Sequence, residues 1–175
     1  VRLLILECDE NQKVKILASR RVITRLGEGT DVHGKLIESR ISATISALST
    51  FRHDCRKNGN PPLYAVATSA VREASNGKNF INLAQEKTGI EIEIIYWEEE
   101  ARLNLPGVFW KLPHEHRKKL TIDIGGGSTE FILSESKNIV NFCSSPLGVV
   151  RLTEKFIHQD PVNNIEYENL HTHLS

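Results

Sequence analysis

The segment 121–130 combines an acidic residue, glycines and hydroxyl residues in an order that suits phosphate binding. Asp123 lies near the end of an apolar stretch of strand type, and five small residues follow it: Gly125, Gly126, Gly127, Ser128 and Thr129. Glycines leave consecutive backbone N–H groups uncovered, and such groups bind phosphate oxygens. Asp123 can hold a divalent cation directly or through water. The segment predicts a phosphate site, and a tight hairpin turn is the alternative.

A second candidate is the acidic run Glu98, Glu99 and Glu100. A carboxylate held beside a phosphate can act as a general base on water. Acidic runs also open helices, where negative charge suits the amino-terminal end of the helix dipole. The run therefore leaves two interpretations open, a general base and a solvated helix start.

The third candidate is Arg72 in the segment 67–74, where a strand leads through small and hydroxyl residues into the arginine. A guanidinium in this setting can anchor an oxyanion with two parallel hydrogen bonds. The alternative is a helix capped by Thr68 or Ser69, with Arg72 on the surface.

Other motifs of catalysis or metal binding are missing from the sequence. The glycine run matches neither G-x-x-x-x-G-K-[ST] nor G-x-G-x-x-G, which disfavours those two nucleotide-binding folds. The seven histidines show no metal-ligand spacing, and no Ser–His–Asp or Cys–His arrangement stands out. Cys8, Cys55 and Cys143 are odd in number, far apart and without a CxxC pair, which indicates a reducing cytosol rather than a disulfide framework or a zinc knuckle.

The composition excludes two classes of partner. The 175 residues carry 22 Lys and Arg against 22 Asp and Glu, so overall charge supports neither wrapping of duplex DNA nor adhesion to an anionic membrane. Aromatic residues make up 6%, so Trp97 and Trp110 are expected in a core or interface rather than in a base-stacking surface. The apolar runs fall far short of the roughly 20 residues that span a membrane. We expect neither a nucleic acid nor a membrane as partner.

Periodicity predicts an α/β framework in the first part of the chain. Strands over 1–8 and 13–23 are expected to form a hairpin, and a helix with apolar residues three and four apart follows Gly34. The further expected elements are a strand over 63–67, a helix beginning near Thr68, a helix over 79–88, an alternating strand over 90–94 and a helix opening at Glu98.

The second part of the chain has the pattern of a β-meander that starts a new lobe. A polar loop over 114–119 precedes it, and its strands are expected over 120–124, 130–133 and 138–143. A helix over 152–158 and a polar tail over 160–175 follow, the tail with too little apolar content to close a core. The complete order predicts mixed sheets with flanking helices. Because the chain opens within a strand and contains no methionine, we interpret it as a fragment.

Three segments, taken together and in order, resemble the exopolyphosphatase / guanosine pentaphosphate phosphatase (Ppx/GppA) family, in its N-terminal portion. They are ATSAVREASN at 67–76, EEARL at 99–103 and IDIGGGSTE at 122–130, with support from RLGEG at 25–29 and PLGVVRL at 146–152. The resemblance spans nearly the whole chain. It implies an actin-like ATPase fold, which is a duplicated ribonuclease H-like α/β fold. Residues 1–116 would then be a first lobe lacking its opening phosphate loop, and 117–175 the incomplete start of a second.

The resemblance also implies an activity, which is Mg²⁺-dependent hydrolysis of the terminal phosphate of inorganic polyphosphate or of the 5′ γ-phosphate of guanosine pentaphosphate. By position, Glu100 matches the catalytic base, Arg72 the phosphate-gripping arginine and Asp123 the carboxylate on the cation side. The remaining matches are the second phosphate loop, formed by Gly125, Gly126, Gly127 and Ser128, and an acidic residue of the cleft, Glu130. A cytoplasmic location is expected, and a homodimer of the full-length protein is compatible with the resemblance.

The chain departs from the family pattern in three places. The opening phosphate loop does not precede Val1, Tyr96 and Trp97 stand where the family has Ser-Gly, and Pro106 stands where a helix should continue. An interior proline is expected to kink that helix. The altered residues around Glu100 favour an alternative function, a catalytically inactive sensor module that binds polyphosphate or an alarmone. The intact Glu100, Arg72 and Asp123 oppose this alternative. A third hypothesis, an actin-like ATPase or sugar kinase, is disfavoured by the EEARL and VREA segments.

Overall fold

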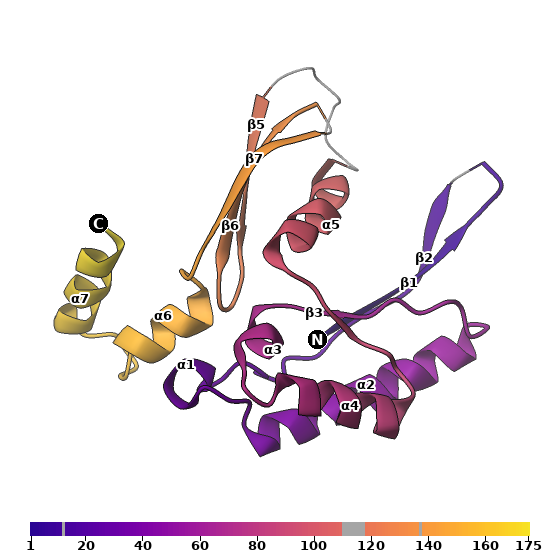
Figure 1. Ribbon diagram of the computed structural model, residues 1–175, viewed down its shortest axis with the longest axis horizontal. Helices are drawn as coiled ribbons and strands as arrows, with labels where there is room; N and C mark the ends of the chain where they lie inside the picture. Colours follow the sequence, from indigo (N-terminus) through magenta and orange to yellow (C-terminus); the bar gives the residue numbers. More distant parts are fainter. Residues whose placement is uncertain (12, 110–117, 137) are drawn as a thin grey trace. The chain divides into compact units, whose positions relative to one another are not determined.

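The computed structural model describes residues 1–11, 13–109, 118–136 and 138–175, and the chain forms two compact units, Val1–Ile94 and Ile95–Ser175 (Figure 1). Each unit has a hydrophobic core of its own. The division falls before the helix that carries Glu100, so this helix packs with the strands that follow it. The predicted lobe boundary between 116 and 117 stays a prediction. Trp110 and the first part of the expected 114–119 loop lie outside the described residues.

Unit 1 opens with the predicted β-hairpin. β1 (Arg2–Cys8) pairs antiparallel with β2 (Val14–Arg21), and the register shifts between Ile5 and Leu6. Leu3 and Ile5 are buried, and the residues between and after them are exposed, as expected for a strand with one covered face.

A second, parallel strand pair in unit 1 is shorter than the sequence predicts. β3 (Val66–Ala67) pairs with β4 (Glu93–Ile94), and the β1–β2 and β3–β4 sheets are separate. The strands expected over 63–67 and 90–94 are therefore wrong in length. In both segments alternate residues are buried or half-buried against the core of unit 1, but only two residues of each segment find partners in a ladder.

Four helices of unit 1 cover and connect these strands: α1 (Thr30–His33), α2 (Glu38–Lys57), α3 (Ser69–Glu73) and α4 (Gly77–Thr88). α2 and α4 supply six of the twelve buried residues of this core, among them Phe51 and Phe80. The helical pattern after Gly34 is thus confirmed.

Phe51→Ala in the full-length protein is expected to lower the free energy of unfolding by about 3–5 kcal/mol, because a buried ring is lost and a cavity remains. Phe51 is 4% exposed, whereas Tyr64 in the same unit is 93% exposed. Tyr64→Ala is therefore the matched control, with an expected change within about 0.5 kcal/mol. Urea unfolding curves measure both, and equal losses in the two variants would contradict the burial of Phe51.

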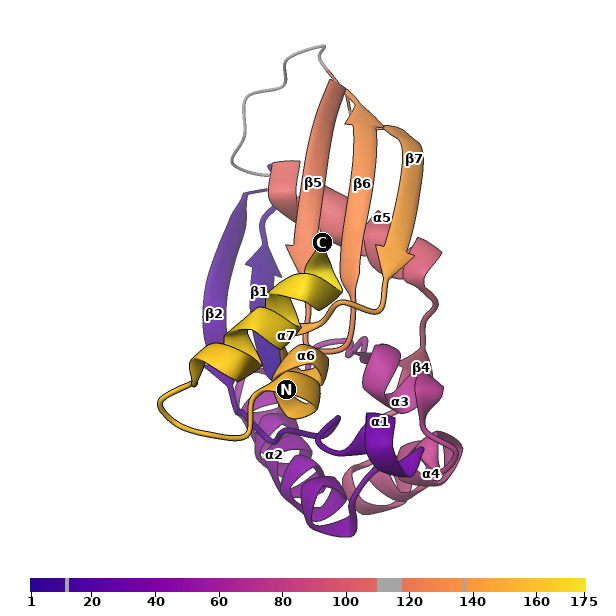
Figure 2. The ribbon, with the colours of Figure 1, turned by 90° about the vertical axis from the view of Figure 1, so that its left-hand side faces the viewer.

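Unit 2 places one helix against a three-stranded meander (Figure 2). α5 (Trp97–Phe109) precedes an antiparallel sheet of order β5–β6–β7, whose strands are β5 (Lys118–Ile124), β6 (Thr129–Glu135) and β7 (Asn138–Ser145). Ala101, Leu105 and Phe109 of α5 pack with Ile132 of β6. The predicted meander is confirmed, and α5 continues three residues past Pro106.

Two helices complete unit 2. α6 (Val149–Phe156) agrees with the expected helix, but α7 (Asn164–Leu174) forms within the segment read as a polar tail. Its start is a capping box: Asn163 Oδ1 accepts from the Glu166 amide at 2.9 Å, and Glu166 Oε2 accepts from the Asn163 amide at 3.3 Å. Local hydrogen bonds thus start a helix that the apolar pattern did not indicate. No helix among the described residues is long and apolar enough to cross a lipid bilayer.

Candidate functional site

The glycine run forms the turn between β5 and β6. The Gly125 amide donates to the Ser128 carbonyl at 2.8 Å and closes the turn. Within the described residues, no hydrogen bond uses the amide N–H of Gly126, Gly127 or Ser128. These three amides and the Ser128 hydroxyl are therefore the donors that the turn can offer an anion, while the Gly125 amide is already engaged.

The start of α6 donates hydrogen bonds to the backbone carbonyl groups of this turn. The Val149 amide donates to the Gly125 carbonyl at 3.0 Å, and the Val150 amide donates to the Gly126 carbonyl at 2.9 Å. Gly148 lies so close to the turn that a Cβ at this position would overlap the Gly126 carbonyl. The contact explains the glycine at 148, which the sequence presented only as part of a supporting motif.

Asp123 and Glu130 face each other across β5 and β6. They are direct partners in the antiparallel register, so their side chains leave the same face of the sheet with Cβ atoms roughly 5 Å apart. Glu130 is 3% exposed and Asp123 is half-buried. Asp123 Oδ2 accepts from Asn104 Nδ2 at 2.6 Å, and Glu130 Oε1 accepts from Ser144 Oγ at 3.0 Å.

The donors to these two carboxylates are neutral, and no ion pair to either carboxylate is recorded in the part of the chain that the structure describes. Like charges directly opposite on neighbouring strands repel. A bound cation would offset that repulsion. The pair Asp123 and Glu130 is therefore the strongest candidate for a cation site.

Glu100 is distinguished from its acidic neighbours by its position on α5. Glu98 and Glu99 are exposed, and Glu99 forms an ion pair with Arg102 at 3.8 Å. Glu100 is half-buried, and its Oε2 atom is buried. It lies four residues before Asn104, which reaches Asp123, so Glu100 shares the helix face directed at the sheet. Of the two interpretations of the acidic run, a solvated helix end fits Glu98 and Glu99 but not Glu100.

Of the two aromatic residues before the acidic run, Trp97 packs against the sheet. Trp97 stacks on Phe142 of β7, with ring centroids 5.0 Å apart and planes inclined at 44°. This contact joins the start of α5 to the sheet, but Trp97 is 39% exposed, so it does not belong to the core and the expected interface position stays a prediction. Tyr96 is exposed, and its carbonyl accepts from the Glu100 amide at 2.9 Å.

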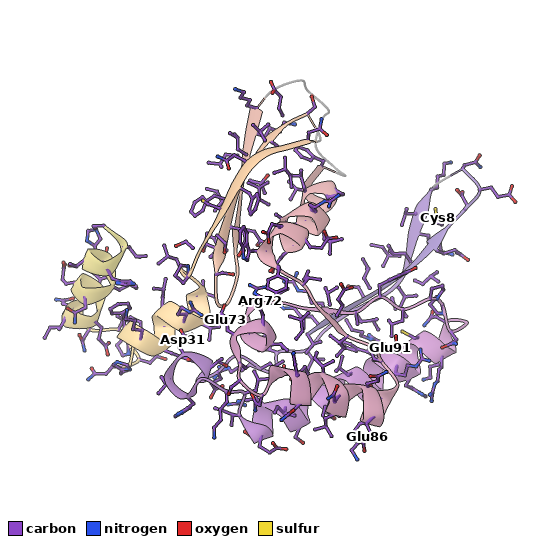
Figure 3. The ribbon with its side chains drawn as sticks, in the orientation of Figure 1. Cys8, Asp31, Arg72, Glu73, Glu86 and Glu91 are labelled. Carbon is purple, nitrogen blue, oxygen red and sulfur yellow. The ribbon has the colours of Figure 1, made fainter. Side chains whose placement is uncertain are left out.

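Arg72 lies in unit 1, on the last turn of α3, and is half-buried (Figure 3). The side chain of Thr68, the N-cap residue, makes no capping hydrogen bond. The segment after α3 is held instead by Asn76, whose amide group accepts from the Leu36 amide at 2.8 Å and donates to the Leu36 carbonyl at 3.0 Å. This double contact fixes the place of α3 and hence of Arg72 within unit 1.

The predicted site residues thus divide between the units. Unit 2 gathers Glu100, Asp123, Glu130 and the 125–128 turn around α5, β5 and β6, whereas Arg72 belongs to unit 1. Sequence reasoning missed Asn104 and Ser144, the partners of the two carboxylates. For Asn104 a signal existed, since it lies one helical turn after Glu100.

Comparison with known proteins bears on the fold and the family of the chain. The model of the Ppx/GppA phosphatase family matches residues 4–175. Exopolyphosphatase 1 of Mycobacterium tuberculosis is 31% identical over 161 residues, which cover 92% of this chain and 47% of the relative. The bifunctional 3-dehydroquinate synthase/phosphatase of Fusobacterium nucleatum is 33% identical over 175 residues, covering 96% of this chain and 26% of the relative.

Solved structures of Ppx/GppA proteins are also similar to this chain. A Ppx/GppA family member from Aquifex aeolicus has a TM-score of 0.76 at 32% identity, over 96% of this chain and 54% of that one. An exopolyphosphatase from Cytophaga hutchinsonii has a TM-score of 0.90 at 29% identity, over 98% and 55%. The predicted α/β fold class, with mixed sheets and flanking helices, is confirmed as the fold of these Ppx/GppA structures. The chain spans about half the length of these solved structures.

Proposed function

Because this chain belongs to the Ppx/GppA phosphatase family, we propose that the full-length protein is a phosphatase that releases the terminal phosphate of a phosphate chain. Inorganic polyphosphate is the first substrate we propose, since several relatives bear the name exopolyphosphatase. The 5′ γ-phosphate of guanosine pentaphosphate is the second. Both present a terminal phosphoanhydride bond, so the same groups would serve either substrate.

One observation carries the proposal: the carboxylate pair Asp123 and Glu130 lies beside a turn with three uncommitted amides, Gly126, Gly127 and Ser128. Phosphoryl transfer is promoted mainly by positioning and by offsetting negative charge on the transferred group. Backbone amides and a cation held by carboxylates supply that offset. A hairpin with a structural role alone would need neither uncommitted amides nor paired acidic residues.

We propose Mg²⁺ as the cofactor, held by Asp123 and Glu130. Mg²⁺ prefers oxygen ligands and is commonly bound by one or two carboxylates, with water and substrate phosphate completing its coordination. The two carboxylates fit this requirement, although the described residues contain no group of three metal-ligating side chains. When bound, the ion would neutralise charge on the phosphate oxygens.

Glu100 is the proposed general base. Its carboxylate takes a proton from the attacking water as the water oxygen forms a bond to the terminal phosphorus. The bridging P–O bond breaks, and the shortened phosphate chain leaves with the bonding electrons. Arg72 is proposed to bind substrate phosphate oxygens through its guanidinium, and the amides of the 125–128 turn bind others.

Orthophosphate release by the full-length protein with Mg²⁺, from long-chain polyphosphate and in parallel from guanosine pentaphosphate, tests this function. Release from either substrate that depends on Mg²⁺ would support the phosphatase and rank the two substrates. Saturable polyphosphate binding without release would favour the sensor module instead. Saturable ATP binding with no affinity for polyphosphate would favour the ATPase or sugar kinase.

Arg72→Ala is expected to raise the KM for polyphosphate about 10–100-fold with a smaller effect on kcat, because a charge-assisted hydrogen bond contributes about 1.5–3 kcal/mol to binding. Arg56→Ala, at an exposed position on α2 of the same unit, is the matched control and should leave KM unchanged. Steady-state kinetics on polyphosphate measures both variants. An unaltered KM in Arg72→Ala would place Arg72 outside the substrate site.

For the compartment we propose the reducing cytosol. The three cysteines are all free, and Cys55 is buried without a disulfide partner. A homodimer of the full-length protein is also proposed, and sedimentation velocity would distinguish it from a monomer.

A further inference from the structure

Asn104 makes a contact that ties the helix carrying Glu100 to the strand carrying Asp123. Its Nδ2 atom donates to Asp123 Oδ2 at 2.6 Å, and the two residues lie on α5 and β5 (Figure 2). A carboxylate only accepts hydrogen bonds, so the amide group must present its NH₂ side to Asp123.

The surroundings of Asn104 make this contact rigid. Ala101 and Leu105 on either side of it along α5 are 0% and 3% exposed and belong to the core of unit 2. The backbone that carries the amide group is therefore held by packing. Groups on a packed helix position their partners more accurately than groups on a loop.

Fixing one oxygen of a planar carboxylate also fixes the direction of the other. With Oδ2 of Asp123 bound to Asn104, Oδ1 is the oxygen left for another ligand. Glu130, across the ladder, is held in a parallel way by Ser144 at 3.0 Å. Each carboxylate of the pair thus has one oxygen held by a neutral donor and one oxygen not so held.

We propose that Asn104 is a positioning residue, which orients Asp123 to bind the divalent cation and sets the place of Glu100, one turn earlier on α5, relative to it. This inference rests on the proposed phosphatase function. Partners that orient metal-binding side chains typically change metal affinity or activity by about 10–100-fold when they are removed.

Asn104→Leu in the full-length protein tests the proposal. We expect the Mg²⁺ dissociation constant, measured by titration calorimetry without substrate, to rise about tenfold. Phosphate release from polyphosphate should fall by a similar factor at limiting Mg²⁺ and recover as Mg²⁺ is raised. The KM for polyphosphate at saturating Mg²⁺ should stay within about twofold, which a general disturbance of the fold would not produce.

Asn58→Leu is the matched control, because Asn58 is also half-buried and its Nδ2 donates to the Asp54 carbonyl at 2.8 Å, on α2 of unit 1. It should lose stability but keep its Mg²⁺ affinity. Asn104→Ala removes the same donor without added bulk and guards against misfolding of the leucine variant. Unchanged Mg²⁺ affinity in either folded Asn104 variant would overturn the proposal.

Different results would contradict the proposed phosphatase function and the positioning role of Asn104. A wild-type protein that binds Mg²⁺ but releases no phosphate from either substrate would contradict the proposed function, and calorimetry on the Asn104 variants would still decide the role of Asn104. A wild-type protein that binds no Mg²⁺ would overturn the positioning role together with the cofactor assignment.

Discussion

Glu100→Gln is expected to lower kcat for polyphosphate hydrolysis by about 10²–10⁴-fold and to leave polyphosphate affinity nearly unchanged. Glutamine keeps the size and polarity of the side chain but cannot accept a proton from water. Glu100 is half-buried on the face of α5 that is directed at the sheet, so the substitution should alter the chemistry and not the packing. Single-turnover phosphate release and equilibrium binding of polyphosphate measure the two quantities separately.

Glu99→Gln provides the matched control for this experiment. It is the same substitution on the preceding residue, where the carboxylate is exposed and paired with Arg102. An exposed ion pair contributes about 0–1 kcal/mol to stability, so this variant should retain its activity. If both variants turn over as fast as the wild type, Glu100 is not the base. If both lose activity equally, the acidic run acts as a whole rather than through one residue.

Gly148→Ala is expected to reduce kcat/KM for polyphosphate about 100-fold, although residue 148 need not touch substrate. An alanine Cβ would overlap the Gly126 carbonyl and also approach Gly127, so the turn and the start of α6 must move apart. A displacement of roughly 1 Å in a group that positions substrate can cost about 10²-fold in rate. The backbone at Gly148 is in the extended region, with φ −100°, so the effect comes from contact and not from backbone strain.

The matched control is Gly107→Ala on α5. A Cβ there meets nothing within 4 Å, and alanine is the better helix former, so activity should persist and stability should not fall. Steady-state kinetics on both variants is combined with circular dichroism to establish that each is folded. Wild-type kcat/KM in a folded Gly148→Ala variant would show that the glycine turn does not form part of the phosphate site.

The elements that the sequence predicted well are those whose pattern is local. The apolar strand of β1, the polar turn that leads into β2, the three-and-four spacing of α2 and the glycine turn between two strands each depend on neighbours within a few residues. The ordered motifs around Arg72, Glu100 and Asp123 identified the family for the same reason, because each is a short run of sequence. Their roles in binding and catalysis stay predictions.

The elements that were predicted wrongly, β3, β4 and α7, depend on hydrogen bonds that apolar periodicity does not report. β3 and β4 are short because a strand is defined by its partner, and the apolar pattern of 63–67 reports only that alternate residues pack against the core. α7 begins with a capping box that apolar periodicity does not detect.

By itself, then, the sequence determined the α/β class, the family and the residue types available for phosphate chemistry. Only the tertiary structure decided that Asp123 faces Glu130. It also decided that Asn104 and Ser144 donate hydrogen bonds to these two carboxylates, and that Gly148 packs closely against the glycine turn. These contacts join residues between 7 and 22 positions apart in the chain, which lie on different strands, helices and turns. No periodicity within one element encodes them, because they depend on how separate elements pack.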